Sequence, residues 1–304
     1  MNIIVGIEDI AQKYANQIGT ENIYAFCDYK GDYLDKSIGG LPVISLKELT
    51  EIWEKYQVVL AVPGSRKGEE ARKKLAEAGV SYSYYLGDDE ERLFKNVYKN
   101  KLWGEDERKH ETQYYSGAGS HDERIIVPYI NLLRQLIINN GIRSIFEVGC
   151  GDFNIMRQVL ENMDDVTYIG GDIVPELVEQ NNRRYAQKNI QFIHINGARD
   201  TKQYAGGDLL IFRQVFQHNS NRNIEVMLKQ SKKYKYTLVT EDVYINEGVE
   251  YNIDMHTSAS TRVEMKSGVY IDKPPFNVQN SVNLLTVPRE ISEIRTTLII
   301  SNAT

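Results

Sequence analysis

An acid beside two glycines forms the group of residues best suited to chemistry. Glu147 lies in the apolar run Ser144–Val148, which predicts a buried strand. Gly149 and Gly151 follow it, ahead of an amphipathic run at 155–160 that predicts a helix. Such a turn brings a ligand close to the backbone, and the helix start offers free N–H groups. Glu147 is therefore expected at the carboxyl end of a strand, where open α/β sheets bind ligands.

A second acid strengthens this prediction. Asp172 ends the next predicted strand, 165–172, and follows Gly151 by about 20 residues. An acid at this place accepts hydrogen bonds from ribose hydroxyls. The dinucleotide fingerprint requires a third glycine where Asn154 stands. The pattern therefore favours a nucleoside ligand without a diphosphate.

These residues carry a family resemblance. The run 147–152, followed by 170–172, resembles the first two motifs of class I S-adenosylmethionine-dependent methyltransferases. Phe153 stands where many members carry a further glycine. The chain from about Trp103 to Thr304 is similar to bacterial methyltransferases of capsule and surface-glycan biosynthesis. The segments that carry this similarity are Tyr115–Ser120, Phe212–His218, Ser267–Val269 and Pro274–Phe276.

The resemblance implies an α/β fold, a Rossmann-like class I methyltransferase sheet with an antiparallel edge. It implies S-adenosylmethionine as the cofactor and S-adenosylhomocysteine as its product. Asn196 stands near the place where an acid of the family accepts the adenine amino group, and its carbonyl oxygen could do the same. The expected cofactor-binding residues are Tyr115, Ser116, Glu147, Gly149, Gly151, Asp172, Ile173, Asn196, Gly197, Ala198, Arg213 and Gln214.

His218 is the predicted catalytic residue. Methyl transfer from a sulfonium is an in-line displacement, so the protein has to orient the nucleophile and help to remove its proton. A histidine with a pKa near neutral can accept that proton from an alcohol. His218 follows the predicted fourth strand, 208–212, whose carboxyl end should face the methyl group. A packed histidine with satisfied hydrogen bonds is the alternative interpretation.

A further polar group follows the predicted fifth strand, 236–240. Its members are interpreted as substrate-binding residues: Glu241, Asp254, His256 and Arg262. Arg262 could hold a phosphate or a nucleotide-linked sugar by charge-assisted bonds. The acids and the histidine could also bind a divalent metal or lie at the surface. No metal site is predicted, because their spacing matches no recognised ligand pattern.

The chain is predicted to have two domains. Residues 1–88 alternate strands and helices, and they resemble a small Rossmann-like domain with a degenerate nucleotide site. Glu8 and Asp9 follow Gly6 at a helix start, where they would repel a phosphate, whereas Asp28 keeps the ribose-acid position. A docking or dimerisation role is preferred. Residues 89–110 are interpreted as a linker, and 111–304 as the methyltransferase domain.

Composition narrows the class of protein. The chain has 304 residues and a net charge of −6, without a basic block, which argues against nucleic-acid binding. No apolar run approaches the ~18 residues of a membrane span. Cys27 and Cys150 are too few for a disulfide framework. The N-terminus does not resemble a signal peptide, so a cytoplasmic location is expected. A homodimer is compatible with these features.

The sequence therefore predicts an O-methyltransferase. Its acceptor would be a sugar hydroxyl, or a phosphate- or phosphoramidate-type oxygen, on a surface-glycan precursor such as a nucleotide-linked sugar. The acceptor class rests on the resemblance. Two alternatives stay open: an NAD-dependent sugar oxidoreductase that uses the N-terminal domain, and a non-catalytic nucleoside-binding scaffold.

Overall fold

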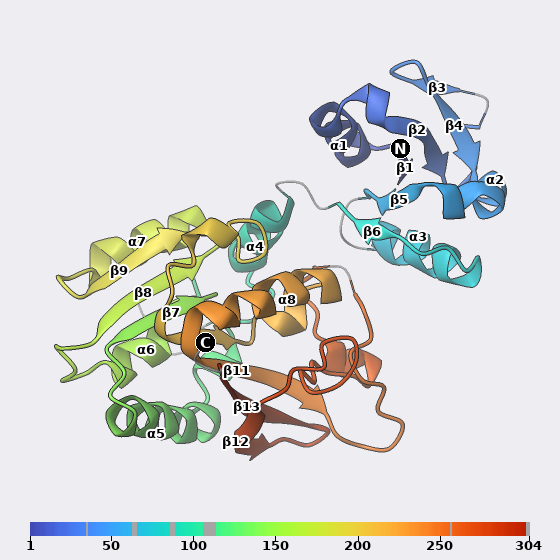
Figure 1. The fold of residues 1–304 in the computed structure, drawn as a ribbon. Coiled ribbons are helices and arrows are strands. Elements are labelled where there is room, and N and C mark those ends of the chain that lie inside the picture. The colour runs from blue at the N-terminus through green and yellow to red at the C-terminus, as the bar shows by residue number, and fades with distance from the viewer. Residues whose placement is uncertain (35, 63–65, 86–88, 106–113, 256, 302–304) are drawn as a thin grey trace. The chain divides into compact units, whose positions relative to one another are not determined.

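Two compact units make up the chain, Met1–Glu90 and Glu91–Thr304. A computed structural model describes all residues except 35, 63–65, 86–88, 106–113, 256 and 302–304 (Figure 1). Each unit has its own sheet and its own core.

The N-terminal unit is a six-stranded sheet in the order β3-β4-β2-β1-β5-β6. Its strands pair in parallel, apart from the antiparallel pair β3–β4. Apolar side chains of α1 pack on one face, and those of α2 and α3 on the other. The elements are β1 (Asn2–Val5), α1 (Asp9–Ile18), η1 (Thr20–Asn22), β2 (Ile23–Asp28), β3 (Ser37–Ile38), β4 (Leu41–Ser45), α2 (Leu46–Ile52), η2 (Trp53–Lys55), β5 (Gln57–Leu60), α3 (Arg66–Glu77) and β6 (Ser83–Tyr84).

The Gly6 turn and the Asp28 carboxylate of this unit are both occupied by contacts within the protein. Gly6 has a φ of 121°, and a Cβ there would lie 2.4 Å from the Ala61 carbonyl oxygen. The Asp28 carboxylate accepts bonds from the backbone N–H groups of Lys30 and Tyr33, at 3.0 and 2.7 Å. Gly6 therefore serves close packing of β1 against the end of β5, and Asp28 holds its own loop.

The C-terminal unit is a seven-stranded sheet in the order β12-β13-β11-β10-β7-β8-β9. Strands β7 to β11 are mutually parallel, whereas β13 runs antiparallel to both β11 and β12. The predicted Rossmann-like sheet with an antiparallel edge is confirmed. Its strands are β7 (Ser144–Val148), β8 (Thr167–Asp172), β9 (Ile190–His194), β10 (Gly207–Arg213), β11 (Tyr234–Tyr244), β12 (Ser281–Pro288) and β13 (Ser292–Ile300).

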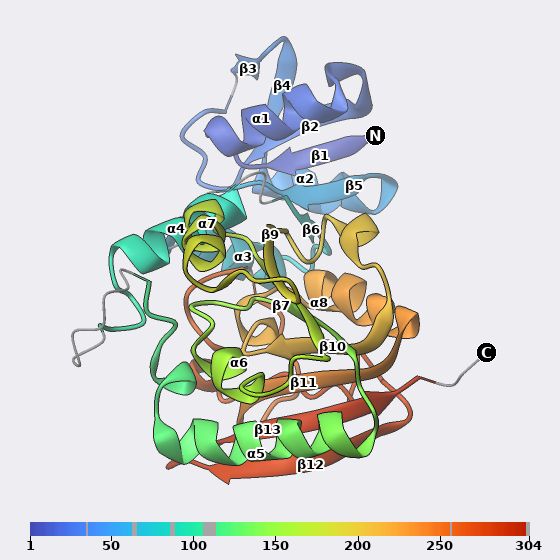
Figure 2. The same ribbon diagram turned by 90° about the vertical axis from the view of Figure 1, so that its left-hand side faces the viewer.

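Helices cover both faces of this sheet. Successive strand residues point to opposite faces, so Ile145 and Phe146 enter different cores. The Ile145 core is covered by α5, α6 and α7, and the Phe146 core by α8, which lies across the sheet from α5 in Figure 1. Figure 2 shows α5 running along β12. The helices are α4 (Asp89–Lys99), η3 (Ala118–Ser120), α5 (Glu123–Asn139), α6 (Asn154–Val159), α7 (Pro175–Tyr185), η4 (Thr201–Gln203), η5 (Phe216–His218), α8 (Asn221–Leu228), η6 (Lys229–Lys233) and η7 (Arg262–Met265).

Three segments differ from the sequence prediction. Val269–Ile271 has the apolar composition of a strand and is buried, but it forms no strand, because its backbone bonds to Asn252 instead of pairing in the sheet. The helix α8 was not predicted, and α4 occupies the first part of the segment interpreted as a linker. Phe94 and Tyr98 of α4 pack with Val174 and Leu177 of the C-terminal unit, so this part of the segment belongs to a packed core.

Candidate functional site

The glycine turn after β7 is tightly packed. Gly149 and Gly151 have φ angles of 78° and 55°, and Phe153 is also left-handed at 63°. A Cβ on Gly149 would lie 2.3 Å from Val215 Cγ2, and one on Gly151 would lie 2.4 Å from Ser116 Oγ. Both glycines are therefore required by the backbone and by their neighbours, and Phe153 adopts the conformation for which a glycine is usual.

Every backbone N–H of this turn already has an acceptor. The N–H groups of residues 149 and 150 donate to the Gly171 carbonyl, that of residue 151 to Asp172 Oδ2, and that of residue 152 to Ser116 Oγ. Those of residues 153 and 154 donate to the Cys150 carbonyl and to Asp152 Oδ1, and all six distances are 2.8 to 3.3 Å. The N–H groups of residues 149–154 are therefore engaged, which corrects the expectation of free donors for the turn and for Asn154, the first residue of α6. A diphosphate needs such donors, so the turn suits a ligand that does not require them.

Three buried carboxylates surround the turn: Glu147, Asp152 and Asp172. Burial raises the pKa of the Glu147 carboxyl to about 7, against the opposing effects of a bond from Tyr168 and the charge of Arg213. The Tyr168 hydroxyl donates to Glu147 Oε2 at 2.5 Å. Burial also raises the pKa of Asp172. A cation bound here would stabilise the ionised form of both acids.

Asp172 joins the ends of two neighbouring strands. Its Oδ2 accepts from Gly151 N at 3.0 Å, and its Oδ1 accepts from Val174 N at 3.1 Å. A carboxylate offers about four lone-pair positions, so it retains capacity for further donors such as ribose hydroxyls. Ile173, which follows, is partly buried and packs with Tyr98 and Leu177.

The segment 114–121 is fastened over the turn by Asp152. Ser116 N donates to Asp152 Oδ2 at 3.0 Å, and Asp152 N donates to Ser116 Oγ at 2.9 Å. His121 Nε2 lies 2.7 Å from the same Oδ2, and its ring stacks on Tyr115 at 4.5 Å. The Tyr98 hydroxyl lies 3.2 Å from Ser116 Oγ. Sequence reasoning selected Tyr115 and Ser116 but missed Asp152, although it lies within the glycine motif.

Arg213 and Gln214 connect β10 to the same segment. The buried Arg213 guanidinium donates from Nη2 to the Gly119 carbonyl at 2.6 Å and lies 5.0 Å from the centre of the Tyr129 ring. Gln214 has a φ of 54° and lies against Gly119, where a Cβ would meet its amide oxygen at 2.0 Å. The predicted residues 115, 116, 147, 149, 151, 172, 213 and 214 are thus brought together.

Asn196 is placed differently from the expectation. Its Oδ1 accepts from the backbone N–H groups of Ala198 and Arg199, both at 3.1 Å, and its own N–H donates to Asp200 at 2.7 Å. The Gly197 carbonyl accepts from the Tyr204 hydroxyl at 2.8 Å. The side-chain oxygen expected to accept an adenine amino group is therefore engaged in shaping the 196–200 turn.

His218 is buried at the carboxyl end of β10. Its Nδ1 lies 3.1 Å from the Ser260 carbonyl, and its Nε2 lies 3.2 Å from Gln217 Nε2. The Trp103 indole covers the imidazole at a ring distance of 5.0 Å, with Phe94 at 6.2 Å. Burial lowers the pKa of His218 to about 4, so the ring is neutral at pH 7. A neutral imidazole is the form that accepts a proton.

The predicted substrate residues serve the protein's own backbone. Glu241 is buried, and its carboxylate accepts from three backbone N–H groups at residues 215–217. Arg262 is fully buried and donates to the carbonyls of Phe216, Asn219 and Ile253, so the expectation that it holds a substrate phosphate is corrected. Asp254 Oδ1 accepts from Asn221 N at 2.7 Å. His256 lies outside the described residues.

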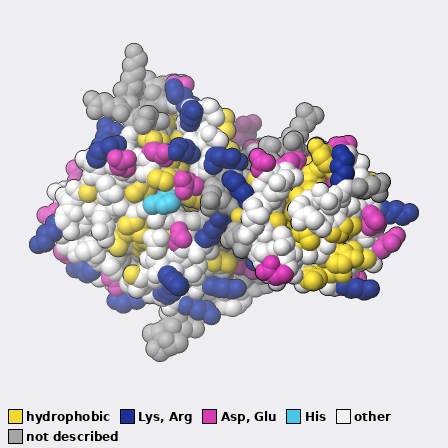
Figure 3. Space-filling model, turned by 90° about the horizontal axis from the view of Figure 1, so that it is seen from above, with side chains coloured by type: hydrophobic (Ala, Val, Ile, Leu, Met, Phe, Trp, Pro, Cys, Tyr) yellow, Lys and Arg dark blue, Asp and Glu magenta, His cyan; other side chains and the backbone are white. Residues whose placement is uncertain are grey.

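The described residues contain neither a metal cluster nor a membrane-spanning helix. Over the part of the chain that the structure describes, no group of three His, Cys, Asp or Glu side chains is arranged to hold a metal ion. Among the same residues, no helix has the length and apolarity to cross a membrane. Figure 3 shows acidic and basic side chains interspersed over one face of the molecule, without a broad field of either sign.

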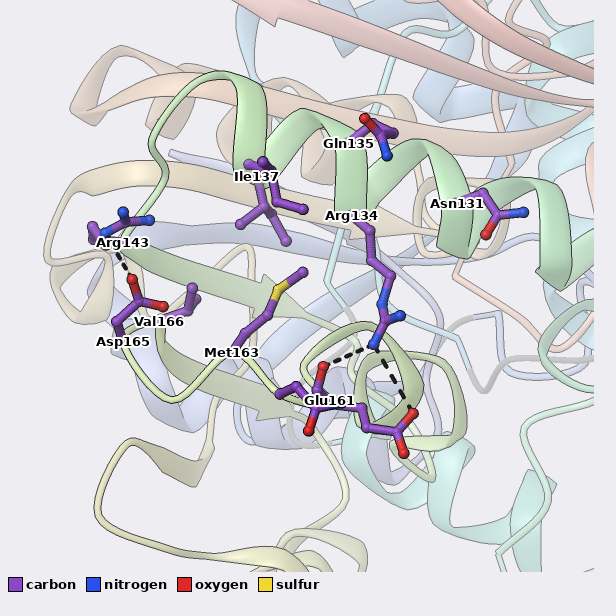
Figure 4. Close-up of a pocket in the computed structure, with 11 residues that line it drawn as sticks. Asn131, Arg134, Gln135, Ile137, Arg143, Glu161, Met163, Asp165 and Val166 are labelled. Carbon is purple, nitrogen blue, oxygen red and sulfur yellow. Dashed lines mark hydrogen bonds and ion pairs between the residues drawn. The ribbon is translucent and has the colours of Figure 1, made fainter.

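A surface hollow of about 580 Å³ lies at the amino ends of the parallel strands, opposite the glycine turn. It is bordered by α5 and by the residues just before β7 and β8, and Figure 4 shows its arginines paired within it. Arg134 donates to the carbonyls of Val159 and Glu161, at 3.1 and 2.8 Å, and Arg143 pairs with Asp165 at 3.3 Å. The amino ends of parallel strands are not where α/β sheets bind ligands. We therefore assign the site to the carboxyl edge.

Comparisons with known proteins give distant structural matches. No protein-family model matches the chain, and no curated protein matches it. The solved N-terminal domain of EvdMO1 with SAH bound is 9% identical at a TM-score of 0.42, over 57% of this chain and 81% of that one. An O-methyltransferase family protein from Burkholderia thailandensis is 12% identical at 0.43, over 78% and 85%. Magnesium protoporphyrin IX methyltransferase (ChlM) from Synechocystis PCC 6803 with bound SAH is 10% identical at 0.43, over 70% and 97%. These values carry no argument about activity, which is inferred from this chain's own side chains.

Proposed function

We propose that this chain is an S-adenosylmethionine-dependent O-methyltransferase. The observation that carries the proposal is the set of three buried carboxylates around a glycine turn whose N–H groups are all engaged. Such a turn is poorly suited to a diphosphate and well suited to a positively charged ligand without phosphate. S-adenosylmethionine fits this description through its sulfonium and its amino group.

The residues at the carboxyl ends of the strands would each have a separate role in binding the cofactor. Asp172 would accept hydrogen bonds from the ribose hydroxyls, and Glu147 would compensate the positive charge of the ligand. Both are buried acids at the ends of adjoining strands. Tyr115 and Ser116 would cover the ligand, held by Asp152. Arg213, Gln214 and the 196–198 turn would shape the rest of the pocket. The donor supplies an activated methyl group when bound.

His218 would take the proton of the acceptor hydroxyl. The ring is neutral, follows β10, and lies under Trp103. A positioned base contributes roughly 10²–10⁴ in rate, so an Asn substitution should cost about that factor in turnover while the cofactor still binds. If a scaffold role were correct, His218→Asn would change no measurable activity.

The acceptor class rests on the resemblance of 115–120, 212–218, 267–269 and 274–276. We infer a sugar hydroxyl, or a phosphate- or phosphoramidate-type oxygen, on a capsular or surface polysaccharide precursor. A nucleotide-linked sugar is the form in which such a precursor would be presented. A cytoplasmic location and a homodimer are part of the same proposal.

Calorimetry tests the function directly. We expect S-adenosylhomocysteine to bind the full chain with one site per protein and NADH to give no heat. NADH binding without S-adenosylhomocysteine binding would overturn the proposal in favour of the oxidoreductase. A crystal soaked with S-adenosylhomocysteine should place its adenosine between the 149–151 turn and Asp172, and any other location contradicts it.

A further inference from the structure

The turn that carries His218 is bound from one side by Glu241. The Glu241 carboxylate accepts from the N–H groups of Val215, Phe216 and Gln217, at 3.2, 2.9 and 2.9 Å. The side chain is buried at the carboxyl half of β11. Three backbone donors on one buried carboxylate fix the entry to the turn, because each lost bond leaves a buried group unpaired.

Arg262 binds the other side of the same turn. Its Nη1 donates to the Phe216 carbonyl at 2.8 Å, and its Nη2 donates to the Asn219 carbonyl at 2.6 Å. Nε donates to the Ile253 carbonyl at 2.9 Å, so the guanidinium also joins the turn to the 253–262 segment. Arg262 is fully buried. Its planar fork reaches these carbonyls together, which a lysine ammonium does not reproduce.

The partners of the imidazole then define its tautomer. A carbonyl only accepts, so the bond to Ser260 O requires the hydrogen on Nδ1. The Gln217 amide is oriented by Asp242 N, which donates to its Oε1 at 3.3 Å. Its Nε2 therefore faces His218 Nε2 as a donor, at 3.2 Å. The lone pair of the ring lies on Nε2.

We propose that Glu241 and Arg262 are positioning residues that clamp the 215–219 turn and so fix His218 with Nδ1 protonated and Nε2 as the proton-accepting atom. The proposal rests on the proposed methyl transfer. In that step the acceptor hydroxyl takes the place of the Gln217 N–H group at His218 Nε2 and transfers its proton to His218 Nε2. The oxygen electron pair forms the bond to the methyl carbon, and the carbon–sulfur bond breaks with its electrons remaining on the sulfur.

Long-range ¹H–¹⁵N NMR of histidine-labelled full chain tests the clamp without knowledge of the acceptor. The His218→Asn variant identifies the His218 signals among the five histidines. Wild type should show Nδ1 protonated and Nε2 unprotonated at pH 7. Arg262→Lys should mix the tautomers and raise the ring pKa by at least about one unit toward its unperturbed value near 6.5, because water reaches a loosened turn.

Arg134→Lys is the matched control, since Arg134 also donates to two backbone carbonyls but at the opposite edge of the sheet. It should leave the His218 signals unchanged. Glu241→Gln is a second variant for the other side of the clamp, and it should also mix the tautomers. Wild type with Nε2 protonated overturns the proposal without any variant, as does a folded Arg262→Lys with wild-type signals.

Titration with S-adenosylhomocysteine separates the two proposals. If wild type binds none, the proposed function fails, whereas the tautomer result stands on its own. If wild type binds it and Arg262→Lys keeps the wild-type tautomer, the clamp fails and the function does not.

Discussion

Replacing Gly151 by alanine should destabilise the C-terminal unit by two separable effects. The residue has a φ of 55°, and an L side chain in the left-handed region costs about 1–2 kcal/mol. The new Cβ would also lie 2.4 Å from Ser116 Oγ, which accepts from Asp152 N. Displacing this hydroxyl forfeits a hydrogen bond worth about 1 kcal/mol. We expect a total loss of about 2–3 kcal/mol in the free energy of unfolding.

Gly141 provides the matched control. Its φ is 60°, but a Cβ at this residue would have no heavy atom within 4 Å, so Gly141→Ala should cost the backbone term of about 1–2 kcal/mol alone. Ser116→Ala removes the displaced hydroxyl. The double variant Gly151→Ala, Ser116→Ala should therefore be less destabilised than the sum of the single variants, by about 0.5–1 kcal/mol.

Urea unfolding followed by tryptophan fluorescence measures these differences. The chain has two tryptophans, Trp53 and Trp103, so a Trp53→Phe background leaves an indole that reports the C-terminal unit. Equal costs at Gly151 and Gly141, or strict additivity with Ser116→Ala, would refute the inference that Ser116 is fastened against the turn.

Two further predictions concern the buried acids. The folded-state pKa of Glu147, about 7, lies above its ordinary value of 4.5, so its contribution to stability is present below pH 4.5 and is lost as the pH rises through 7. Between pH 4.5 and 7, Glu147→Gln should reduce the change in the free energy of unfolding by about 3 kcal/mol. Denaturant titrations at several pH values measure this change, and the same pH dependence in wild type and variant would contradict the assignment. Asp172→Ala should weaken S-adenosylhomocysteine binding by at least about tenfold, which calorimetry measures as about 1.4 kcal/mol. Asp165→Ala, just before the far end of the same strand, is the control, and equal affinity of all three proteins would count against a ribose contact.

Local patterns predicted the fold of both units well. The helix Pro175–Tyr185 starts at a proline and has periodic apolar residues, and both are local signals. The strand Ser144–Val148 and its glycine turn were recognised for the same reason. By contrast, Val269–Ile271 has the composition of a strand, and only its distant hydrogen-bond partner Asn252 decides otherwise.

The site could be predicted in part. The positions of Glu147, Gly151 and Asp172 followed from the motif, since each lies at or just after a strand end. The engagement of Asn196 and Arg262 did not, because a side chain's hydrogen-bond partners depend on segments that meet only after folding. Arg262 reaches carbonyls more than forty residues away in the chain. From the sequence alone, an arginine that binds the protein's own backbone cannot be distinguished from one that binds a substrate.

The strand order bears on how the C-terminal sheet is assembled. β13 lies between β11 and β12, with Tyr236–Tyr244 of β11 paired to Ser292–Ile300. β12 has no position on the sheet until β13 has joined β11, although β12 precedes β13 along the chain. The neighbouring strands β12 and β13 can form a hairpin early, since local contacts require little loop closure. We therefore expect this hairpin to dock as a preformed unit, and the annealing of β11 with β13 to be the slower event.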